Sequence, residues 1–589
     1  MRLHQRDFGS DRRLLYISAI AAVIGGTSTI AAFVLLNLIH LFTNLFFFQT
    51  FSFVNRSPSE HTLGAWVIVV PVIGSLVVGL IARFGSDKIR GHGIPEAIEA
   101  ILFGKSRMSA KVAVLKPLSS GIVIGSGGPF GAEGPIIMTG GAIGSLIAQH
   151  FMLSAAERKT LLVAGATAGM TAVFGTPVAA VLLAVELLLF EWRPRSLLPV
   201  ILACAVAGFA RPLLLDAAPL FPLHTEPVGP VALAVCLVAG LLCGALSAGM
   251  SMALYKVEDM FARLPVHWMW WPALGAVVVG IGGYLEPRAF GVGYDVISDL
   301  LNHKIAASAA LALLTVKAVI WVIALGSGTS GGVLAPLLML GAGLGTVVSM
   351  VSPGGDPSLW SLVCMAAVLA GVLGAPLTAA IFALGLTGDF NALLPLLLAT
   401  GVSYGFTVLA MRRSIMTEKI ARRGRHIYRE YGVDPMERTH AEDIMTTEIV
   451  RIPAEMPLEE MAARYFEGQQ KFRSYPVTSA EGRFIGLVDR ETLHRLRAQH
   501  SGHARIGELL EEASLIALPH QTCRTIATYL AVHGVERVAV VDHPARRRLV
   551  GLISRSDLIK TSLHFYEEEH QREKLIHWTR KRPSQSASS

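Results

Sequence analysis

The sequence predicts a polytopic α-helical membrane domain followed by a water-soluble α/β domain. Residues 14–411 contain 18 basic and 17 acidic side chains in 398 positions, whereas residues 412–589 contain 29 and 24 in 178. A stretch this long with so few charges is typical of a membrane protein. Each of the two parts also contains its own internal repeat.

The apolar part is divided into segments of unequal length. Residues 14–48, 65–82 and 231–253 are long enough to cross a bilayer. Four arginines among the first 13 residues precede the first segment, which is too long for a signal peptide, so we expect a retained helix and a cytoplasmic N-terminus at residues 1–13. Many other segments are short and broken by Gly or Pro, which is typical of transporters and channels.

A repeat connects the two halves of the apolar part. Residues 125–135 (GSGGPFGAEGP) resemble residues 326–336 (GSGTSGGVLAP) at an offset of 201, and Gly140 recurs as Gly341 at the same offset. Repeated halves of transporters are often inverted, with the ligand site between them near the midplane. The sequence therefore predicts an inverted-repeat membrane domain with broken helices.

The soluble part begins with a basic run after Met411, which favours the cytoplasmic side. FIGLVDRETL at 484–493 recurs as LVGLISRSDL at 549–558, and each copy follows a helical stretch and a short strand. The predicted divisions are a membrane domain at 14–411, a linker at 412–440 that continues the last membrane helix, α/β units at 441–500 and 501–562, and a tail at 563–589 with a disordered end.

Three Gly-rich turns precede apolar helices, at 91–95, 125–135 and 326–336. The first N–H groups of a helix have no intrahelical partner and carry the positive end of its dipole, so three such helix starts can attract an anion together. Glu133 lies in the second turn, where a charge at membrane depth is costly. We expect its carboxylate to occupy the anion's place and to open the path on protonation or movement; the alternative is an acid that only stabilises a helix start.

Several classes of protein are disfavoured. The basic residues form no concentrated patch, so nucleic acid is not an expected partner. The five cysteines lack CxxC spacing and there is no HExxH, so neither a metal site nor an intramembrane protease is expected. A divalent-cation transporter with a soluble tail of this kind needs several carboxylates at membrane depth, where Glu133 and Glu186 stand nearly alone. We expect a protein that is no enzyme and requires no cofactor.

The three turns resemble those of the CLC family of chloride channels and chloride/proton antiporters. GHGIP at 91–95 is similar to the family's GSGIP, GAEGP at 131–135 to GREGP, and GVLAP at 332–336 to GxFxP. The soluble repeats resemble a pair of CBS domains, so the resemblance covers residues 15–562. It implies a homodimer in a bilayer of the bacterial inner-membrane type, with one chloride pathway per subunit and cytoplasmic termini and CBS domains.

The resemblance also implies site residues. Glu133 matches the external gating glutamate, which exchanges protons, and Lys116 matches a lysine that the family often has before it. Lys116 is expected either to be solvated at an anion entrance or to snorkel. The implied anion site consists of His92, Gly93, Ile94, Val333, Leu334 and Met416.

Three departures from the family pattern bear on mechanism. His92 and Met416 stand where the family has a serine and a tyrosine that give hydroxyl groups to the central anion. His92 either supplies an N–H instead or packs away from the ion, and Met416 cannot donate. Leu187, next to Glu186, stands where antiporters often have an inner proton-transfer glutamate. We therefore favour a channel or weakly coupled carrier, with a proton-coupled antiporter or transport of another anion as alternatives.

The second CBS copy resembles the nucleotide-binding end of such modules. Ser554 and Asp557 at a helix start would hold phosphate and ribose, with Phe472 stacking on the base of ATP, ADP or AMP. The first copy has Asp489 and Thr492 instead, which places an acid where phosphate would lie. At most one nucleotide site is expected, and the alternative is a purely structural pair that dimerises.

Overall fold

The computed structural model describes residues 13–561 except 217–218, 353–354, 412, 425–426, 428–434, 468–471 and 512–514. The chain divides into two compact units, with the boundary between Arg423 and Gly424. The predicted cytoplasmic N-terminus, apart from Arg13, and the predicted C-terminal tail lie outside the described residues.

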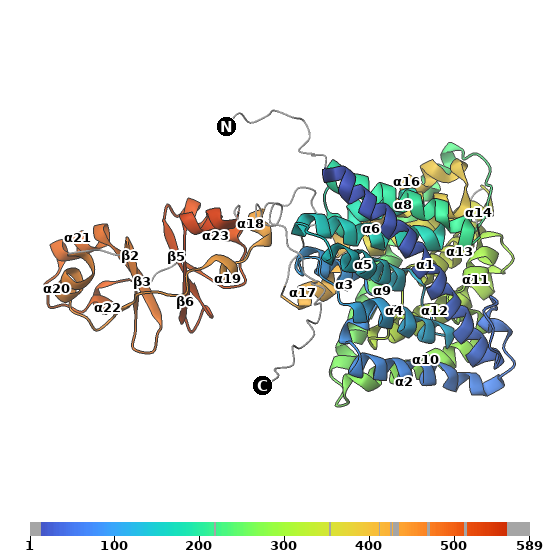
Figure 1. The fold of residues 1–589 in the computed structure, drawn as a ribbon, viewed down its shortest axis with the longest axis horizontal. Helices are drawn as coiled ribbons and strands as arrows, with labels where there is room; N and C mark the ends of the chain where they lie inside the picture. Colours follow the sequence, from blue (N-terminus) through green and yellow to red (C-terminus); the bar gives the residue numbers. More distant parts are fainter. Residues whose placement is uncertain are drawn as a thin grey trace, which may run out of the picture. The chain divides into compact units, whose positions relative to one another are not determined.

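The first unit is helical (Figure 1). Its first half contains α1 (Arg13–Phe48), α2 (Val69–Phe84), α3 (Ile94–Leu102), α4 (Ala110–Gly125), α5 (Glu133–Gln149), α6 (Ala155–Phe174), α7 (Pro177–Leu183) and α8 (Pro194–Leu214). Its second half contains α9 (Pro230–Ala262), α10 (Trp271–Leu285), α11 (Tyr294–Leu301), α12 (Ala307–Gly326), α13 (Leu334–Val351), α14 (Pro357–Leu373), α15 (Pro376–Thr387) and α16 (Leu393–Ala410), followed by α17 (Ile415–Arg422). The order of long and short helices in α1 to α8 recurs in α9 to α16.

The two halves also pack alike. Helix α5 packs on α6 as α13 packs on α14, and α1 packs on α8 as α9 packs on α16. Gly131 N–H donates to the carbonyl of Gly332 over 3.3 Å, and Gly332 N–H donates to the carbonyl of Gly131 over 3.0 Å. These glycines are repeat equivalents, and a mutual exchange between equivalents requires a local two-fold axis, which agrees with the predicted inverted repeat.

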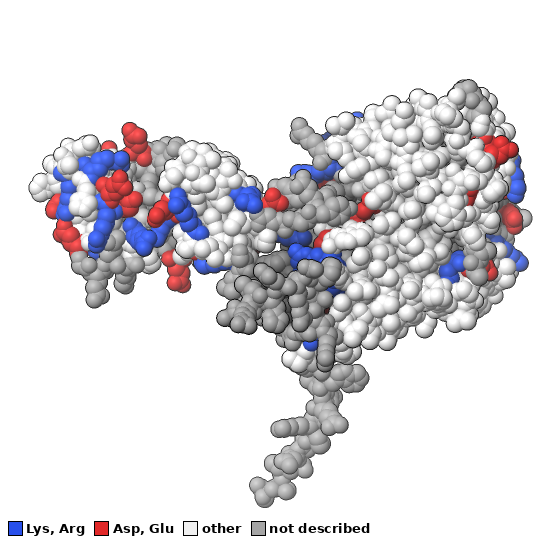
Figure 2. All heavy atoms as spheres, turned by 90° about the horizontal axis from the view of Figure 1, so that it is seen from above, with Lys and Arg blue, Asp and Glu red and all other residues white. Residues whose placement is uncertain are grey.

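The helices of this unit are suited to a bilayer. Among the described residues, eight helical segments are long and apolar enough to cross a membrane, including Arg13–Phe48, Gly64–Phe84 and Pro230–Ala262. These three contain the long segments predicted from the sequence. Figure 2 shows that the visible surface of this unit is largely free of charged side chains.

The linker differs from the prediction. The prediction was that the last membrane helix continues into the linker at 412–440. Instead, α16 ends at Ala410 and α17 begins separately at Ile415 and ends at Arg422. Met411 is extended, with φ −121° and ψ 135°, so the chain leaves the helix there and the expected continuity is wrong in the described residues.

The second unit contains two small sheets. Its elements are α18 (Pro435–Arg438), α19 (Ala441–Ile444), β1 (Ile452–Pro453), α20 (Leu458–Met461), β2 (Ser474–Thr478), β3 (Phe484–Asp489), α21 (Arg490–Gln499), α22 (Ile506–Leu509), β4 (Ile516–Ala517), α23 (Cys523–Val532), β5 (Arg537–Val541) and β6 (Leu549–Ser554). The sheets have the orders β1-β2-β3 and β4-β5-β6, and in each the first pair is parallel and the second antiparallel. Two equivalent α/β modules result.

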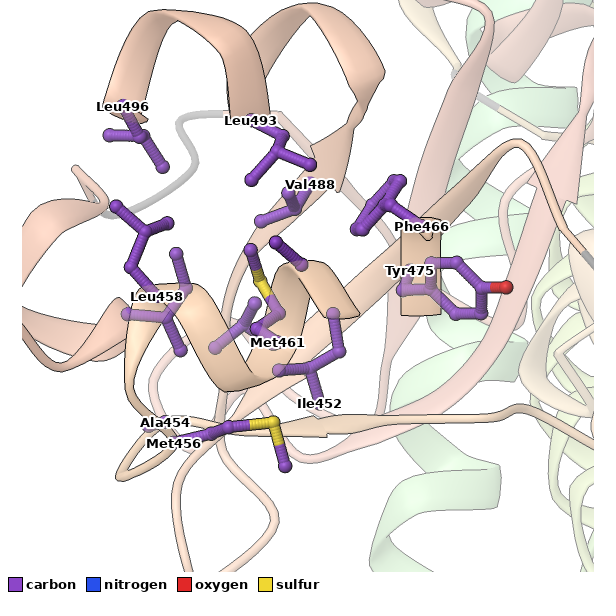
Figure 3. Packing of buried hydrophobic residues seen from close by; sticks show 13 residues of the cluster. Ile452, Ala454, Met456, Leu458, Met461, Phe466, Tyr475, Val488, Leu493 and Leu496 are labelled. Carbon is purple, nitrogen blue, oxygen red and sulfur yellow. The ribbon is translucent and has the colours of Figure 1, made fainter. Parts of the chain in front are cut away.

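The hydrophobic core of each module includes a short helix that precedes the other module in the sequence. The first core, shown in Figure 3, is built around Leu458, Val488 and Leu493, and it also contains Ile506 from α22. The second core instead contains Ala441 and Ile444 from α19. Each module is therefore completed by a segment that precedes the other one, so residues 441–444 of the predicted first unit pack in the second.

Candidate functional site

Three loops meet inside the helical unit. Gly91 N–H donates to the Thr329 carbonyl over 3.1 Å, and the Gly131–Gly332 pair joins the other two loops. A Cβ added to Gly134 would lie 2.1 Å from the carbonyl oxygen of His92, so only a glycine allows this approach. The starts of α3, α5 and α13 are thereby brought together, as the sequence predicted.

Glu133 lies at this meeting point and is fully buried. Its Oε1 accepts a hydrogen bond from the Ala335 N–H in the first turn of α13, and the N–H of Leu334 also faces the carboxylate. A Cβ on Gly131 would lie 1.9 Å from Oε2 of Glu133, so the glycine leaves room for the carboxylate. Oε2 has no hydrogen-bond partner. A negative group thus occupies the unsatisfied N–H groups of a helix start.

The predicted backbone ligands begin the other two helices. Gly93 is the N-cap of α3 with φ 88°, a left-handed conformation that favours glycine, and Ile94 is the first helical residue. Val333 is the N-cap of α13 and Leu334 its first residue. Ile94, Val333 and Leu334 are fully buried, and Gly93 is buried as well. These residues therefore lie where free helical N–H groups are expected.

His92 and Met416 lie in neighbouring segments. His92 is 6% exposed, its ring interacts with the backbone of Ile415, and its Nδ1 has no hydrogen-bond partner. Met416 follows Ile415 and is fully buried. The structure thus brings α17 to the loop before α3, but with an imidazole and a thioether in place of two hydroxyl groups.

Glu96 is a charged residue of this region that the sequence reasoning missed. It lies on α3, is 8% exposed, and accepts a hydrogen bond from Lys419 on α17. Arg423 also lies within 3.9 Å of its carboxylate. The available signal was an acid in the first turn of an apolar helix, beside a loop already singled out. This ion pair joins α3 to the helix that carries Met416.

Lys116 is placed differently from either expectation. It is fully buried, and its Nζ donates to the carbonyls of Ile89 and Gly91, each over 2.8 Å, and to Oγ of Ser330 over 2.9 Å. Its ammonium is neither solvated nor snorkelling, because backbone carbonyls and a hydroxyl replace water. Lys116 holds two of the converging loops together, and its role at an anion entrance stays a prediction.

Leu187, which stands where antiporters often have a proton-transfer glutamate, and its neighbour Glu186 have different surroundings. Leu187 is fully buried in a π-helical turn, η4 (Ala184–Leu189). The carboxylate of Glu186 accepts hydrogen bonds from the N–H and hydroxyl of Thr378, at 2.8 and 2.6 Å. Glu186 therefore caps the start of α15.

In the CBS-like unit, the structure brings Ser554 and Asp557 together. The hydroxyl of Ser554 donates to Oδ2 of Asp557 over 2.6 Å, and Lys560 lies 2.5 Å from Oδ1. Burial opposes ionisation of Asp557, but hydrogen bonds from Lys560 and Ser554 outweigh it and hold its pKa below its usual value. These groups suit phosphate and ribose once their mutual contacts open, since the same contacts form an ordinary helix cap.

Phe472 comes from the first module. It lies in the loop before β2, is 43% exposed, and packs edge-on against Tyr475 with ring centroids 5.9 Å apart. An aromatic ring that is partly exposed can stack on a base. In the first module, the carboxylate of Asp489 accepts from the N–H of Thr492 over 2.8 Å, so the acid there caps α21.

Comparisons with known proteins agree with this architecture. The profile of the family described as "Voltage gated chloride channel" matches residues 73–408, and that of the CBS domain matches residues 441–498 and 506–564. The chain belongs to the voltage-gated chloride channel (CLC) family and carries a CBS pair. It is a multi-pass membrane protein of a family of anion transporters and channels, and not an enzyme.

Two curated relatives are similar over more than half of this chain. A protein of Ralstonia nicotianae named "Putative chloride channel protein ClcB-like" is 28% identical over 348 residues, covering 57% of this chain and 81% of the relative. An "H(+)/Cl(-) exchange transporter ClcA" of Salmonella arizonae is 26% identical over 372 residues, covering 60% and 77%.

Solved structures share the fold at low identity. The slow cyanobacterial Cl⁻/H⁺ antiporter has a TM-score of 0.61 at 21% identity, covering 70% of this chain and 98% of that one. A eukaryotic CLC transporter has a TM-score of 0.62 at 19% identity, and the match covers 92% of this chain and 98% of that one. A CLC-type fluoride/proton antiporter has a TM-score of 0.58 at 21% identity, and the match covers 68% of this chain and 96% of that one. The predicted CLC-type fold is therefore confirmed.

Proposed function

We propose that this protein transports chloride through a pathway formed by the starts of α3, α5 and α13, with Glu133 as its gate. The observation that carries the proposal is the hydrogen bond from the Ala335 N–H to the buried carboxylate of Glu133. A carboxylate in this position competes with an anion for the same N–H groups. Protonation or movement of Glu133 removes that competition and opens the pathway.

We favour a channel or a weakly coupled carrier because Leu187 has no proton to exchange. The second candidate is proton-coupled exchange, which the relatives named H(+)/Cl(-) exchange transporters favour. The third candidate is transport of a different anion, because His92 and Met416 replace two hydroxyl donors and one similar solved structure is a fluoride/proton antiporter.

The test is anion efflux from liposomes that contain the purified full-length protein, with external pH recorded. Chloride, bromide, nitrate, fluoride and sulfate are compared for wild type and Glu133→Gln. Chloride efflux without proton movement, made insensitive to pH by Glu133→Gln, supports the proposal. Chloride-driven proton movement that Glu133→Gln abolishes favours the exchanger. Efflux of another anion alone favours the third candidate.

The assembly proposed is a homodimer with one pathway per subunit in a bacterial-type inner membrane. The N-terminus and the CBS pair are placed in the cytoplasm, because basic residues precede α1 and follow α16. Cysteine accessibility at each terminus in intact cells, with a variant lacking native cysteines, tests the orientation.

We also propose that an adenine nucleotide at Ser554, Asp557 and Phe472 regulates transport. The support is a hydroxyl and a carboxylate at one helix start and an exposed aromatic ring. ATP, ADP and AMP are titrated against wild type and Asp557→Ala while binding and efflux are measured. No binding favours the structural CBS pair, and equal binding to both proteins overturns the site at Asp557.

A further inference from the structure

A phenol group on α11, a helix that packs on α13, is not used by the proposed pathway. Tyr294 is the first residue of α11. Its hydroxyl oxygen is buried and makes no hydrogen bond. A buried polar group without a partner is costly, so such groups are rare and call for an explanation.

The position of Tyr294 follows from the two-fold arrangement of the halves. Gly93 and Gly293 are both left-handed N-caps, of α3 and α11, so Tyr294 is the counterpart of Ile94 at the anion pathway. Helix α11 packs on α13, whose first turn holds the Glu133 carboxylate. The inverted repeat thus brings a second helix start, with a hydroxyl group on it, to the gate.

The ring of Tyr294 is held by aromatic neighbours. Phe174 at the end of α6 packs edge-on at 6.3 Å between ring centroids, and Phe221 packs at 6.1 Å. These contacts fix the ring and therefore the place of its hydroxyl group. The hydroxyl group is therefore held in one place, where it can donate a hydrogen bond to a side chain that moves toward it.

The nearby charged groups already have partners. Lys317 on α12 donates to the carbonyls of Ala289 and Gly291, and Lys116 on α4 donates to three oxygens. Asp295 accepts a hydrogen bond from Ser57 over 2.8 Å. Glu133 differs from these groups, because its Oε2, like the Tyr294 hydroxyl group, makes no hydrogen bond.

We propose that Tyr294 is a positioning residue whose hydroxyl group donates a hydrogen bond to the Glu133 side chain when that side chain leaves the Ala335 N–H. The inference rests on the proposed function, in which Glu133 moves. The hydrogen bond from Tyr294 then replaces the one from the Ala335 N–H, so the Glu133 side chain keeps a buried hydrogen-bond partner when the gate is open. Because an ionised carboxylate gains more from the donor than a neutral one, Tyr294 lets the gate open with less protonation.

The test uses chloride efflux from liposomes against pH for wild type, Tyr294→Phe, Glu133→Ala and the double variant. Tyr294→Phe keeps the ring and removes only the hydroxyl group. We expect about tenfold slower efflux at pH 7, the size of a hydrogen bond to a charged group, and a flux profile displaced to lower pH. In the Glu133→Ala background, the same change should alter efflux by less than about twofold.

Tyr284→Phe is the matched control, because Tyr284 is 50% exposed on α10. Wild-type efflux and pH profile in Tyr294→Phe overturn the inference, as does an equal loss with and without Glu133. Failure of the proposed function is distinct: Glu133→Ala then keeps the wild-type pH dependence, or chloride does not move. A structure determined at pH 5 gives a readout without flux, and a displaced Glu133 carboxyl group out of hydrogen-bond reach of Tyr294 also overturns the inference.

Discussion

Lys116 and Lys317 brace equivalent loops in the two halves of the membrane unit. They are 201 residues apart, and both are fully buried. Lys116 donates to the carbonyls of Ile89 and Gly91, and Lys317 donates to those of Ala289 and Gly291, at 2.9 and 3.0 Å. The loops that they hold lead into α3 and α11, so the lysines position the starts of these two helices.

Replacing either lysine with methionine should destabilise the membrane unit. The change leaves two carbonyls without their donors in an apolar interior, and we expect a loss of about 2–4 kcal/mol for each variant. Thermal unfolding in detergent, followed by size-exclusion chromatography, measures the loss. The control is Lys111→Met, since Lys111 is an exposed residue of the same helix α4. Wild-type stability in Lys116→Met would show that the brace is dispensable.

Gly131→Ala should displace the gate. The new Cβ would lie 1.9 Å from Oε2 of Glu133, and a flexible side chain yields more easily than the backbone. We expect chloride efflux at pH 7.5 to rise toward that of Glu133→Gln and to lose its pH dependence. Gly249→Ala on α9 serves as the control, because its added Cβ meets nothing within 4 Å. Slower efflux with unchanged pH dependence would contradict this prediction.

Glu186→Gln should affect stability and not proton coupling. The carboxylate accepts hydrogen bonds at the start of α15 through Thr378, so an amide in its place loses about 1 kcal/mol of capping. The ratio of proton to chloride movement should equal that of wild type, whatever its value. A changed ratio would instead make Glu186 a substitute for the acid that is absent at Leu187.

Acidification should weaken the end of β6 through Asp557. Its pKa is lowered in the folded protein, so its contribution to stability is full above the ordinary aspartate pKa and is lost as pH falls through the lowered value. Hydrogen exchange of β6 amides, corrected for intrinsic rates, should show this loss in wild type and not in Asp557→Asn. Glu491→Gln, an exposed acid on α21, should behave as wild type. Identical acid sensitivity in Asp557→Asn would refute the assignment.

The predicted elements were most accurate where the signal was local. The apolar segment at 14–48 is α1, and the offset of 201 between Gly-rich turns is the offset between α5 and α13. The predicted linker helix was wrong because the basic run says which side of a membrane the segment faces, not where a helix ends. The first CBS boundary could not show that Ala441 packs in the second module, since that contact joins distant segments.

The sequence by itself determined the division into membrane and soluble parts, the repeats in each, and the presence of one acid, Glu133, in the second Gly-rich turn, because composition and spacing are properties of the chain. The tertiary structure decided what those residues touch. Lys116 became a brace because backbone carbonyls of the loop before α3 surround it. Tyr294 came to start a helix that packs on α13, where the Glu133 carboxylate is bound, because a two-fold axis relates halves some 200 residues apart. Such contacts arise from packing, which no local pattern in the sequence encodes.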